Sequence, residues 1–304
     1  MWEHDEKMHP DVFTGQMAKW WLERYSGDGP YFLQIGLPGP HPPYDPTEEY
    51  LKMYDGRDLP EVIPADPEAQ PEALQGLRDF MLQEDADGVV HLANPTPEQI
   101  RRQRAHYYAN VTMIDTQVGE ILDALEARGD LDNSIIIFTS DHGDALGDHG
   151  HSQKWNMYQS TMQVPAIVAG VGIPEGRRIT DNVALFDLGP TILEWASVPV
   201  PAWMEAESLC PYFKDTTAPK RTKVFAEHSN DALLTGTRLM TMLIDEKMKI
   251  VHFIDSDEGQ LFDLASDPDE LTNLWDDAGY KETRSRMIDD ILKWRSESGL
   301  KTQG

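Results

Sequence analysis

The segment SDHGDALGDHGHSQK, at residues 140–154, contains three aspartates, three histidines and one lysine. Carboxylates and neutral imidazoles bind divalent cations: oxygen ligands favour Ca²⁺ or Mg²⁺, and further imidazoles favour Zn²⁺ or Mn²⁺. Two familiar sites are excluded, because the acidic residues do not follow the ligand positions of an EF-hand and the helical His-Glu-x-x-His pattern is absent. The segment is therefore either a cation site of another kind or a charged surface loop.

Two residues of this segment are favoured as functional by their position. Asp141 and His142 come directly after the apolar run at 135–139, which predicts a strand buried on both faces. A second apolar run, at 31–36, predicts another strand, and His41 follows it by a few residues. Because ligands of open parallel sheets bind beyond the carboxyl ends of the strands, we expect these three side chains at one edge of the sheet.

The remaining acidic and imidazole side chains of the segment have a simpler interpretation. Aspartate is common in turns, and connecting segments run over the protein surface. The spacing alone therefore favours turn roles for Asp144 and Asp148 and surface positions for His149 and His151.

The elements that must position these residues are predicted from periodicity and from helix-end signals. Thr96, Pro97 and Gln99 form a capping-box start for a long helix, and Gly129 provides its stop. Residues 56–96 are acidic and rich in proline, which predicts a long surface excursion that could contact substrate. The alternation of helices and strands predicts a parallel α/β sheet, followed by an antiparallel set of strands. The further predicted elements are helices at 11–26, 184–198 and 281–297 and a strand at 164–170.

The composition narrows the class of protein. With 304 residues and 40% hydrophobic content, the chain can bury the core of one large domain or of a domain with a subdomain. The formal net charge of -27 repels nucleic acid and anionic membranes, so neither is an expected partner. The single cysteine, Cys210, excludes an intrachain disulfide framework and a thiolate-rich metal site. The sequence contains no recognisable signal peptide or transmembrane run, and we leave the compartment open.

Three segments carry a resemblance to a known family. FTSDHGDALGDHGHSQKWNMYQSTMQVPAIVAG resembles the sulfatase family of the alkaline-phosphatase-like superfamily, with its Ser-Asp-His/Asn-Gly and Leu-Gly-Asp/Glu-His-Gly motifs, a following lysine and a Val-Pro strand. PYFLQIGLPGPHPPYDPTEEY is similar to that family's strand and Pro-His-x-Pro-Tyr loop. QLFDLASDPDELTNLW resembles its C-terminal segment. The three matches occur in the family's order and span nearly the whole chain.

The resemblance implies a fold and a division into domains. The expected fold is an alkaline-phosphatase-like α/β/α sandwich, truncated at its N-terminus, with a small C-terminal antiparallel α+β subdomain. Residues 1–204 would be the C-terminal part of the α/β core with the metal-site strand, and residues 205–304 the antiparallel subdomain with its terminal helix.

The resemblance also implies roles for single residues. Asp141 and His142 would be two ligands of a divalent metal, Ca²⁺ in most sulfatases and Mg²⁺, Mn²⁺ or Zn²⁺ in related phosphoesterases. Lys154 would hold the sulfate oxygens, and His41 would contact the ester and help protonate or orient the leaving group. His151 is a weaker candidate for substrate binding.

The departures from the family pattern concern the nucleophile. In the family a Cys or Ser in Cys/Ser-x-Pro-x-Arg is oxidised to formylglycine, and an aspartate pair completes the metal site, both upstream of the Pro-His-x-Pro-Tyr loop. Neither occurs upstream of that loop in this sequence. Cys210 lacks the Pro and the Arg, Ser266 has the Pro but ends in Glu, and Thr217 has the spacing but cannot yield formylglycine.

The resulting expectation is a sulfatase-family hydrolase acting on a small-molecule or carbohydrate sulfate ester, with this chain inactive alone for lack of the nucleophile. One alternative is a phosphate or phosphonate ester hydrolase of the same superfamily. Another is a non-catalytic remnant or half-chain that needs an N-terminal partner or self-associates through an exposed sheet edge. Family members are often periplasmic or secreted.

Overall fold

The computed structural model describes residues 1–304 except 28, 84–94, 215–220, 230–233, 235 and 302–304. The chain forms two compact units. The first unit comprises Met1–Val62 and Met81–Ile136, and the second comprises Ile63–Phe80 and Ile137–Gly304. The boundary expected between residues 204 and 205 stays a prediction.

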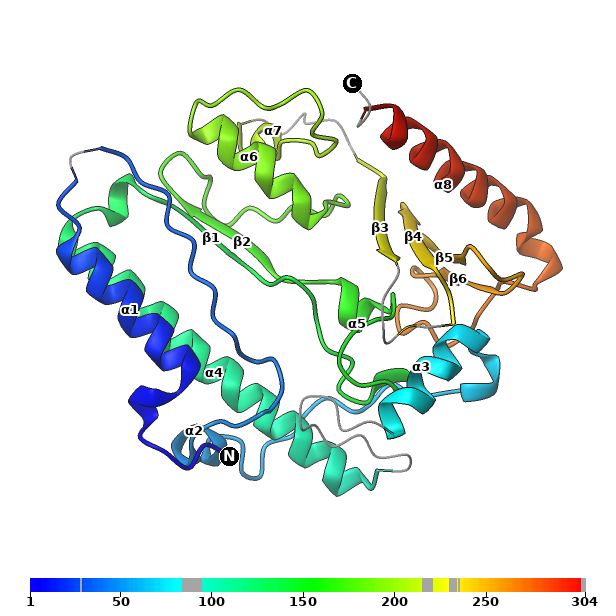
Figure 1. Cartoon of the computed structure of the whole chain (residues 1–304), viewed down its shortest axis with the longest axis horizontal. Helices are drawn as coiled ribbons and strands as arrows, with labels where there is room; N and C mark the ends of the chain where they lie inside the picture. Colours follow the sequence, from blue (N-terminus) through cyan, green and yellow to red (C-terminus); the bar gives the residue numbers. More distant parts are fainter. Residues whose placement is uncertain (28, 84–94, 215–220, 230–233, 235, 302–304) are drawn as a thin grey trace. The chain divides into compact units, whose positions relative to one another are not determined.

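The first unit is built from helices. Its main elements are α1 (Pro10–Arg24), α2 (Glu48–Lys52) and α4 (Pro97–Arg128), with short 3₁₀ turns at Glu6–Met8 and Leu131–Asn133. Helix α1 lies alongside α4, and α2 also packs on α4 (Figure 1). Their shared core consists of Val12, Tyr50, Ala109 and Met113. The helix predicted at 11–26 is confirmed, with its end at Arg24.

The long helix α4 begins and ends where its local signals predict. The Thr96 hydroxyl accepts a hydrogen bond from the Gln99 N–H at 3.3 Å, and the Gln99 side chain accepts one from the Thr96 N–H at 2.8 Å. Gly129 ends the helix in the left-handed region, with φ of 82°. These reciprocal bonds satisfy N–H groups that have no partner within the helix, so α4 is a defined scaffold for the first unit.

The second unit contains two sheets. Strand β1 (Ile135–Thr139), which enters it from the first unit, pairs with β2 (Ala166–Gly170). The second sheet is antiparallel, in the order β3 (Lys223–Ser229), β4 (Leu239–Asp245), β5 (Met248–Phe253) and β6 (Gly259–Asp263). The helices are α3 (Glu72–Gln83), α5 (Gln159–Met162), α6 (Leu188–Trp195), α7 (Cys210–Lys214) and α8 (Lys281–Lys301), with 3₁₀ turns at Pro67–Ala69, Asp148–Gly150, Leu185–Asp187 and Ala278–Tyr280.

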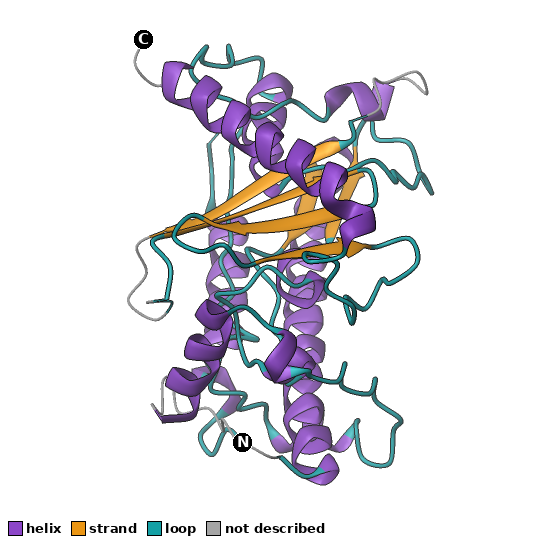
Figure 2. Cartoon of the chain, turned by 90° about the vertical axis from the view of Figure 1, so that its right-hand side faces the viewer, coloured by secondary structure: helices purple, strands orange, loops and turns teal. Residues whose placement is uncertain are grey.

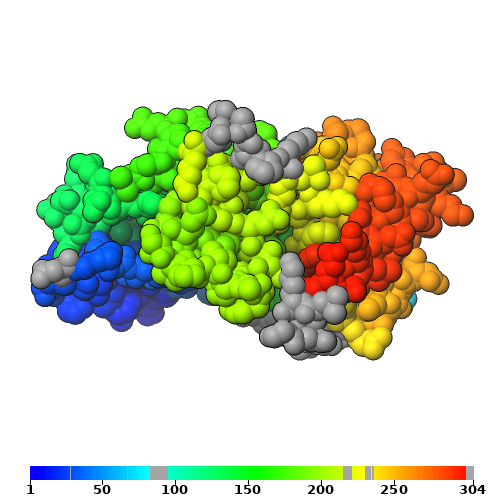
Figure 3. Space-filling model, turned by 90° about the horizontal axis from the view of Figure 1, so that it is seen from above, coloured from blue at the N-terminus to red at the C-terminus, as the bar shows by residue number. Residues whose placement is uncertain are grey.

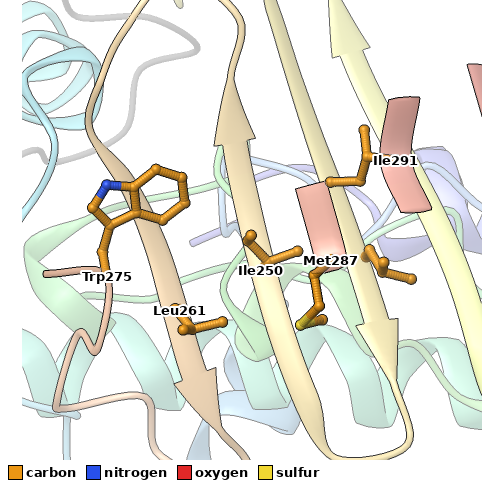
Figure 4. Packing of buried hydrophobic residues seen from close by; sticks show 6 residues of the cluster. Ile250, Leu261, Trp275, Met287 and Ile291 are labelled. Carbon is orange, nitrogen blue, oxygen red and sulfur yellow. The ribbon is translucent and has the colours of Figure 1, made fainter. Parts of the chain in front are cut away.

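The antiparallel sheet has a core that its register explains. Leu243 pairs with Ile250, and Ile250 pairs with Leu261, so the three side chains share one face of the sheet. Helix α8 crosses that face and contributes Met287 and Ile291, and Trp275 closes the cluster (Figures 2 and 4). The predicted antiparallel set and terminal helix are thereby confirmed.

Two sequence predictions about strands need correction. Residues 31–36 belong to no strand, although their side chains alternate between half-buried and exposed as in an extended segment. A strand requires ladder hydrogen bonds with a neighbour, which hydrophobicity alone does not provide. Strand β1 is only half-buried rather than covered on both faces, and four of the five residues of β2 are exposed.

The segment after β2 also presents apolar groups to solvent. Its surface is drawn in yellow-green in Figure 3. The exposed side chains include Val171, Phe186, Val198 and Trp203, of which Trp203 is 61% exposed. Within the parts of the chain that the structure describes, no helix has both the length and the apolar character to cross a bilayer.

Candidate active site

Asp141 and His142 lie directly beyond the end of β1, and their imidazole and carboxylate face each other. His142 Nδ1 lies 2.8 Å from the Gly143 carbonyl oxygen, so Nδ1 carries the ring proton and donates it there. The lone pair is then on Nε2, which lies 3.4 Å from Asp141 Oδ2. A ring that donates its other N–H to a carbonyl is the usual arrangement of a metal-binding histidine.

The same two residues fit a divalent cation as part of a site. The Asp141 side chain is 83% exposed and that of His142 is 34% exposed, so further ligands can reach Oδ2 and Nε2. Among the residues that the structure describes, no group of three or more His, Cys, Asp or Glu side chains could hold a metal ion. The pair therefore supplies two ligands, and a cation there needs others.

Gly143 follows His142 at a place where only glycine fits. Its N–H donates to the Thr161 carbonyl at 2.8 Å, and a Cβ at Gly143 would lie 2.1 Å from the Ser160 carbonyl oxygen. This contact holds the end of the β1 loop against α5. It explains why the Ser-Asp-His-Gly sequence ends in glycine.

The loop then closes on itself and brings Lys154 back toward its start. Asp144 Oδ1 accepts hydrogen bonds from the N–H groups of Leu146 at 2.9 Å and Gln153 at 3.0 Å. The Ala145 N–H donates to the Gln153 carbonyl at 2.8 Å. Gln153 is thus hydrogen-bonded to the residues after His142, and Lys154 follows Gln153 in the chain. The Lys154 Nζ lies 5.2 Å from the centre of the Trp155 ring. The turn role predicted for Asp144 is confirmed.

The backbone on both sides of Lys154 adopts a conformation that residues other than glycine normally avoid. Gln153 has φ of 58° and Trp155 has φ of 74°, so both neighbours of Lys154 are in the left-handed region. Leu146 and His149 are there as well, so four of the seven described non-glycine residues with positive φ lie in this loop. Such residues cost about 1–3 kcal/mol each and persist only where the surroundings impose them. The sequence offers no signal for them, since neither glycine nor asparagine occupies these positions.

His149 and His151 are buried, which corrects the prediction that they are surface groups. Each is 4% exposed. The His149 ring stacks on Tyr158 with centroids 3.8 Å apart, and His151 Nε2 lies 3.0 Å from Gln70 Oε1. Burial and this bond favour a structural role for His151 over contact with substrate.

The partners of this loop come from residues 63–70, which the sequence could not indicate. Asp148 Oδ1 accepts the Ile63 N–H at 2.9 Å, and the His149 N–H donates to the Ile63 carbonyl at 2.9 Å. Gln70 Nε2 donates to the His149 carbonyl at 2.8 Å. Part of the predicted surface excursion at 56–96 thus supports the loop, and residues 84–94 lie outside the described residues.

His41 lies in the first unit. Its Nδ1 is 2.9 Å from the Pro42 carbonyl oxygen, a bond that fixes the ring against its own loop. Its meeting with Asp141, His142 and Lys154 stays a prediction. Cys210 is fully buried, and Thr217 lies outside the described residues.

Comparison with known proteins identifies the family. The sequence profile described as Sulfatase matches residues 3–198. The chain belongs to the sulfatase family. A second profile, described as N-sulphoglucosamine sulphohydrolase, C-terminal, matches residues 147–297. The resemblance seen in the sequence is confirmed.

Individual relatives agree with this assignment. The chain is 32% identical to an arylsulfatase of Clostridium perfringens over 297 residues, which cover 96% of this chain and 59% of the relative. It is 32% identical to a choline-sulfatase of Rhizobium meliloti, covering 90% of this chain and 51% of the relative. The chain therefore spans between half and three fifths of the length of these two relatives.

The fold comparison confirms the predicted α/β, alkaline-phosphatase-like class. The structure of the phosphonate monoester hydrolase of Agrobacterium radiobacter superimposes with a TM-score of 0.82 at 26% identity. The match covers 97% of this chain and 62% of that chain. The structure of a putative sulfatase from Bacteroides thetaiotaomicron superimposes with a TM-score of 0.76 at 21% identity, which shows the fold alone.

Burial of the two loop histidines predicts that the fold is acid-labile. Burial lowers the pKa of His151 to about 3, and burial together with the nearby Lys249 ammonium lowers that of His149 to about 4. Below the ordinary histidine pKa the unfolded chain binds protons that the folded chain does not, so stability is full above about pH 6.5 and falls toward pH 4. We expect a loss of about 1.4 kcal/mol per pH unit for each histidine in this range.

Urea unfolding at several pH values between 8 and 4 measures this slope. His149→Phe keeps an aromatic ring against Tyr158 and removes one titrating group, so it should flatten the curve. His4→Gln, at an exposed position, is the matched control and should leave the curve unchanged. Equal slopes for the wild type and His149→Phe would contradict the prediction.

Proposed function

We propose that this chain is part of a hydrolase that cleaves the sulfate ester of a small molecule or carbohydrate with the help of a divalent cation, Ca²⁺ being the first candidate. The observation that carries the proposal is the arrangement of Asp141 and His142 beyond β1, with the imidazole tautomer set by Gly143. Membership of the sulfatase family supports it, as do the arylsulfatase and choline-sulfatase relatives.

Each side chain has a distinct part in this proposal. Asp141 Oδ2 and His142 Nε2 would hold the cation, which when bound draws electron density from the ester oxygens. Lys154 donates charge-assisted hydrogen bonds to sulfate oxygens, and the strained backbone on both sides sets its direction. His41 orients the leaving oxygen or gives it a proton.

The nucleophile is assigned to a further segment or chain. The Cys/Ser-x-Pro-x-Arg motif, from which formylglycine would form, does not occur in this sequence. Asp141 and His142 also leave room for additional metal ligands. We therefore propose that one partner supplies both, and that the 304 residues alone do not turn over ester.

Hydrolysis of a phosphate or phosphonate monoester is a second candidate. The similarity in fold to a phosphonate monoester hydrolase favours it. A phosphoryl group presents the same set of anionic oxygens to Lys154 and to a cation, so the residues described do not separate the two substrates.

Cation binding and turnover test the proposal separately. Calorimetric titration of the chain with Ca²⁺, Mg²⁺, Mn²⁺ and Zn²⁺ should show binding that Asp141→Asn weakens. Asp132→Asn, in the exposed turn at Leu131–Asn133, is the control and should leave binding unchanged. With a nucleophile-bearing segment supplied, aryl sulfate should be hydrolysed faster than aryl phosphate or phenyl phosphonate. Equal cation binding by the wild type and Asp141→Asn would contradict the metal assignment, and faster phosphonate cleavage would favour the second candidate.

The exposed faces of β1 and β2 predict self-association of the chain. Phe138 is 38% exposed and Ile167 is 59% exposed, although parallel-sheet strands of α/β proteins are normally covered on both faces. We propose that the missing cover is a further segment of the same fold or a second copy of this chain. Sedimentation velocity should show oligomers or aggregates that Ile167→Glu reduces. A monodisperse monomer that unfolds cooperatively would contradict this prediction.

A further inference from the structure

The loop that carries His41 is held by a buried carboxylate of α1. Asp11, in the first turn of that helix, is 1% exposed, and its Oδ1 accepts the Gly39 N–H at 2.7 Å. A Cβ at Gly39 would lie 2.2 Å from Asp11 Oδ2, so only glycine permits this approach. The Asp11 carboxylate therefore fixes the backbone two residues before His41.

The buried His9 ring lies between Asp11 and the other side of the loop. The Asp11 N–H donates to His9 Nδ1 at 3.3 Å, so the proton of the neutral His9 ring is on Nε2. That atom lies 3.5 Å from Asp45 Oδ1, and the ring is 3% exposed. His9 thus lies between Asp11 and Asp45, the carboxylate four residues after His41, but its Nε2 makes no hydrogen bond among the described residues.

Helix α4 provides a third point of attachment. His106 Nδ1 lies 3.0 Å from the Tyr44 carbonyl oxygen, and the Tyr44 and Tyr107 rings meet edge to face with centroids 5.7 Å apart. The Trp2 N–H also donates to the Pro46 carbonyl at 3.0 Å. Hydrogen bonds therefore fix the backbone on both sides of His41.

A buried carboxylate is costly unless hydrogen bonds compensate for lost water. Burial raises the pKa of Asp11, and the Gly39 N–H opposes that rise. The Asp11 carboxylate accepts the Gly39 N–H of the His41 loop. Its position in the first turn of α1 also favours its negative charge. The geometry thus provides a specific connection from α1 to the loop.

We propose that Asp11, through its bond to the Gly39 N–H, is a positioning residue that sets the orientation of His41. This inference rests on the proposed role of His41 in ester cleavage. Because the His41 ring is hydrogen-bonded to the carbonyl of the next residue, Pro42, the orientation of the ring depends on the path of the loop backbone. Release of Gly39 should therefore misplace the imidazole without removing any group that contacts substrate.

The test uses the whole chain and needs no turnover. In Asp11→Ala, the Gly39 amide should exchange with solvent at least ~10-fold faster and the His41 ring resonances should shift. Asp11→Asn keeps an acceptor oxygen and should fall between Asp11→Ala and the wild type. Glu23→Gln, at the exposed end of α1, is the matched control and should change neither readout. If Asp11→Ala does not fold, the comparison of Asp11→Asn with the wild type carries the test by the same two readouts.

Turnover separates this inference from the proposed function. In a preparation that hydrolyses aryl sulfate, Asp11→Ala should lower kcat about 10- to 100-fold with KM nearly unchanged. If His41→Ala leaves kcat unchanged, the role of His41 is wrong while the Gly39 exchange still reports the connection. If His41 resonances are identical in Asp11→Ala and the wild type, Asp11 is a fold residue and the inference is overturned.

Discussion

Replacement of Glu270 by alanine is expected to destabilise the second unit by about 3–5 kcal/mol, because it leaves a buried lysine without its counter-charge. Lys249 lies on β5, its side chain is 0% exposed, and its Nζ is 2.5 Å from Glu270 Oε1. Burial lowers the pKa of Lys249, and the Glu270 carboxylate opposes that shift. Without Glu270 the lysine must lose its proton or draw water into the sheet.

The same carboxylate connects the antiparallel sheet to the candidate active site. Glu270 Oε2 accepts the Gln159 N–H at 2.6 Å, at the start of α5. Helix α5 in turn holds Gly143 through the Thr161 carbonyl. Loss of Glu270 should therefore loosen the loop after His142 as well as the sheet.

Urea unfolding of Glu270→Ala measures the effect, and two variants interpret it. Glu270→Gln keeps an acceptor for the Gln159 N–H but removes the charge, so it separates the hydrogen bond from the ion pair. Asp255→Asn breaks an ion pair whose Arg238 side chain is 79% exposed, and it should leave the unfolding midpoint unchanged. A midpoint for Glu270→Ala equal to that of Asp255→Asn would show that the buried pair does not stabilise the fold.

Replacement of Lys154 by alanine is expected to lower kcat/KM for aryl sulfate about 100- to 1000-fold in a preparation that turns over this substrate. Removal of one preorganised donor to a developing anion has effects of this size. Both neighbours of Lys154, Gln153 and Trp155, have a left-handed backbone, and neither carries a positive charge that could replace the ammonium group.

The matched control for this variant is a lysine with the same charge elsewhere. Lys293 on α8 is 73% exposed, and Lys293→Ala should leave kcat/KM unchanged. Lys154→Arg keeps the charge in a planar shape and should recover part of the activity. Activity of Lys154→Ala within about threefold of the wild type would remove Lys154 from the proposed site.

Several structural features of this chain could be predicted because their signals are local. The capping box at Thr96 and the left-handed Gly129 define α4 within one turn at each end. The turn role of Asp144 depends on N–H groups two and nine residues away. Asp141 and His142 lie beyond the end of β1 as predicted, because the apolar run before them is visible in the sequence. Their role as metal ligands stays a prediction.

The features that the sequence did not reveal depend on partners far along the chain. In the sequence, His149 and His151 cannot be distinguished from surface histidines. They are buried against Ile63 and Gln70, which lie about 80 residues earlier in the chain. Residues 31–36 are mostly apolar, as β1 is, yet hydrogen-bonded pairing with a neighbour makes only β1 a strand.

The sequence by itself determined the family, the helix with capping signals and the antiparallel sheet, and it proposes Asp141 and His142 as metal ligands. Only the tertiary structure decided which polar groups are buried: Lys249 against Glu270, Asp11 against Gly39, and His151 against Gln70. The physical reason is that periodicity and capping act over a few residues. The low dielectric environment that makes these pairs necessary exists only when distant segments exclude water together.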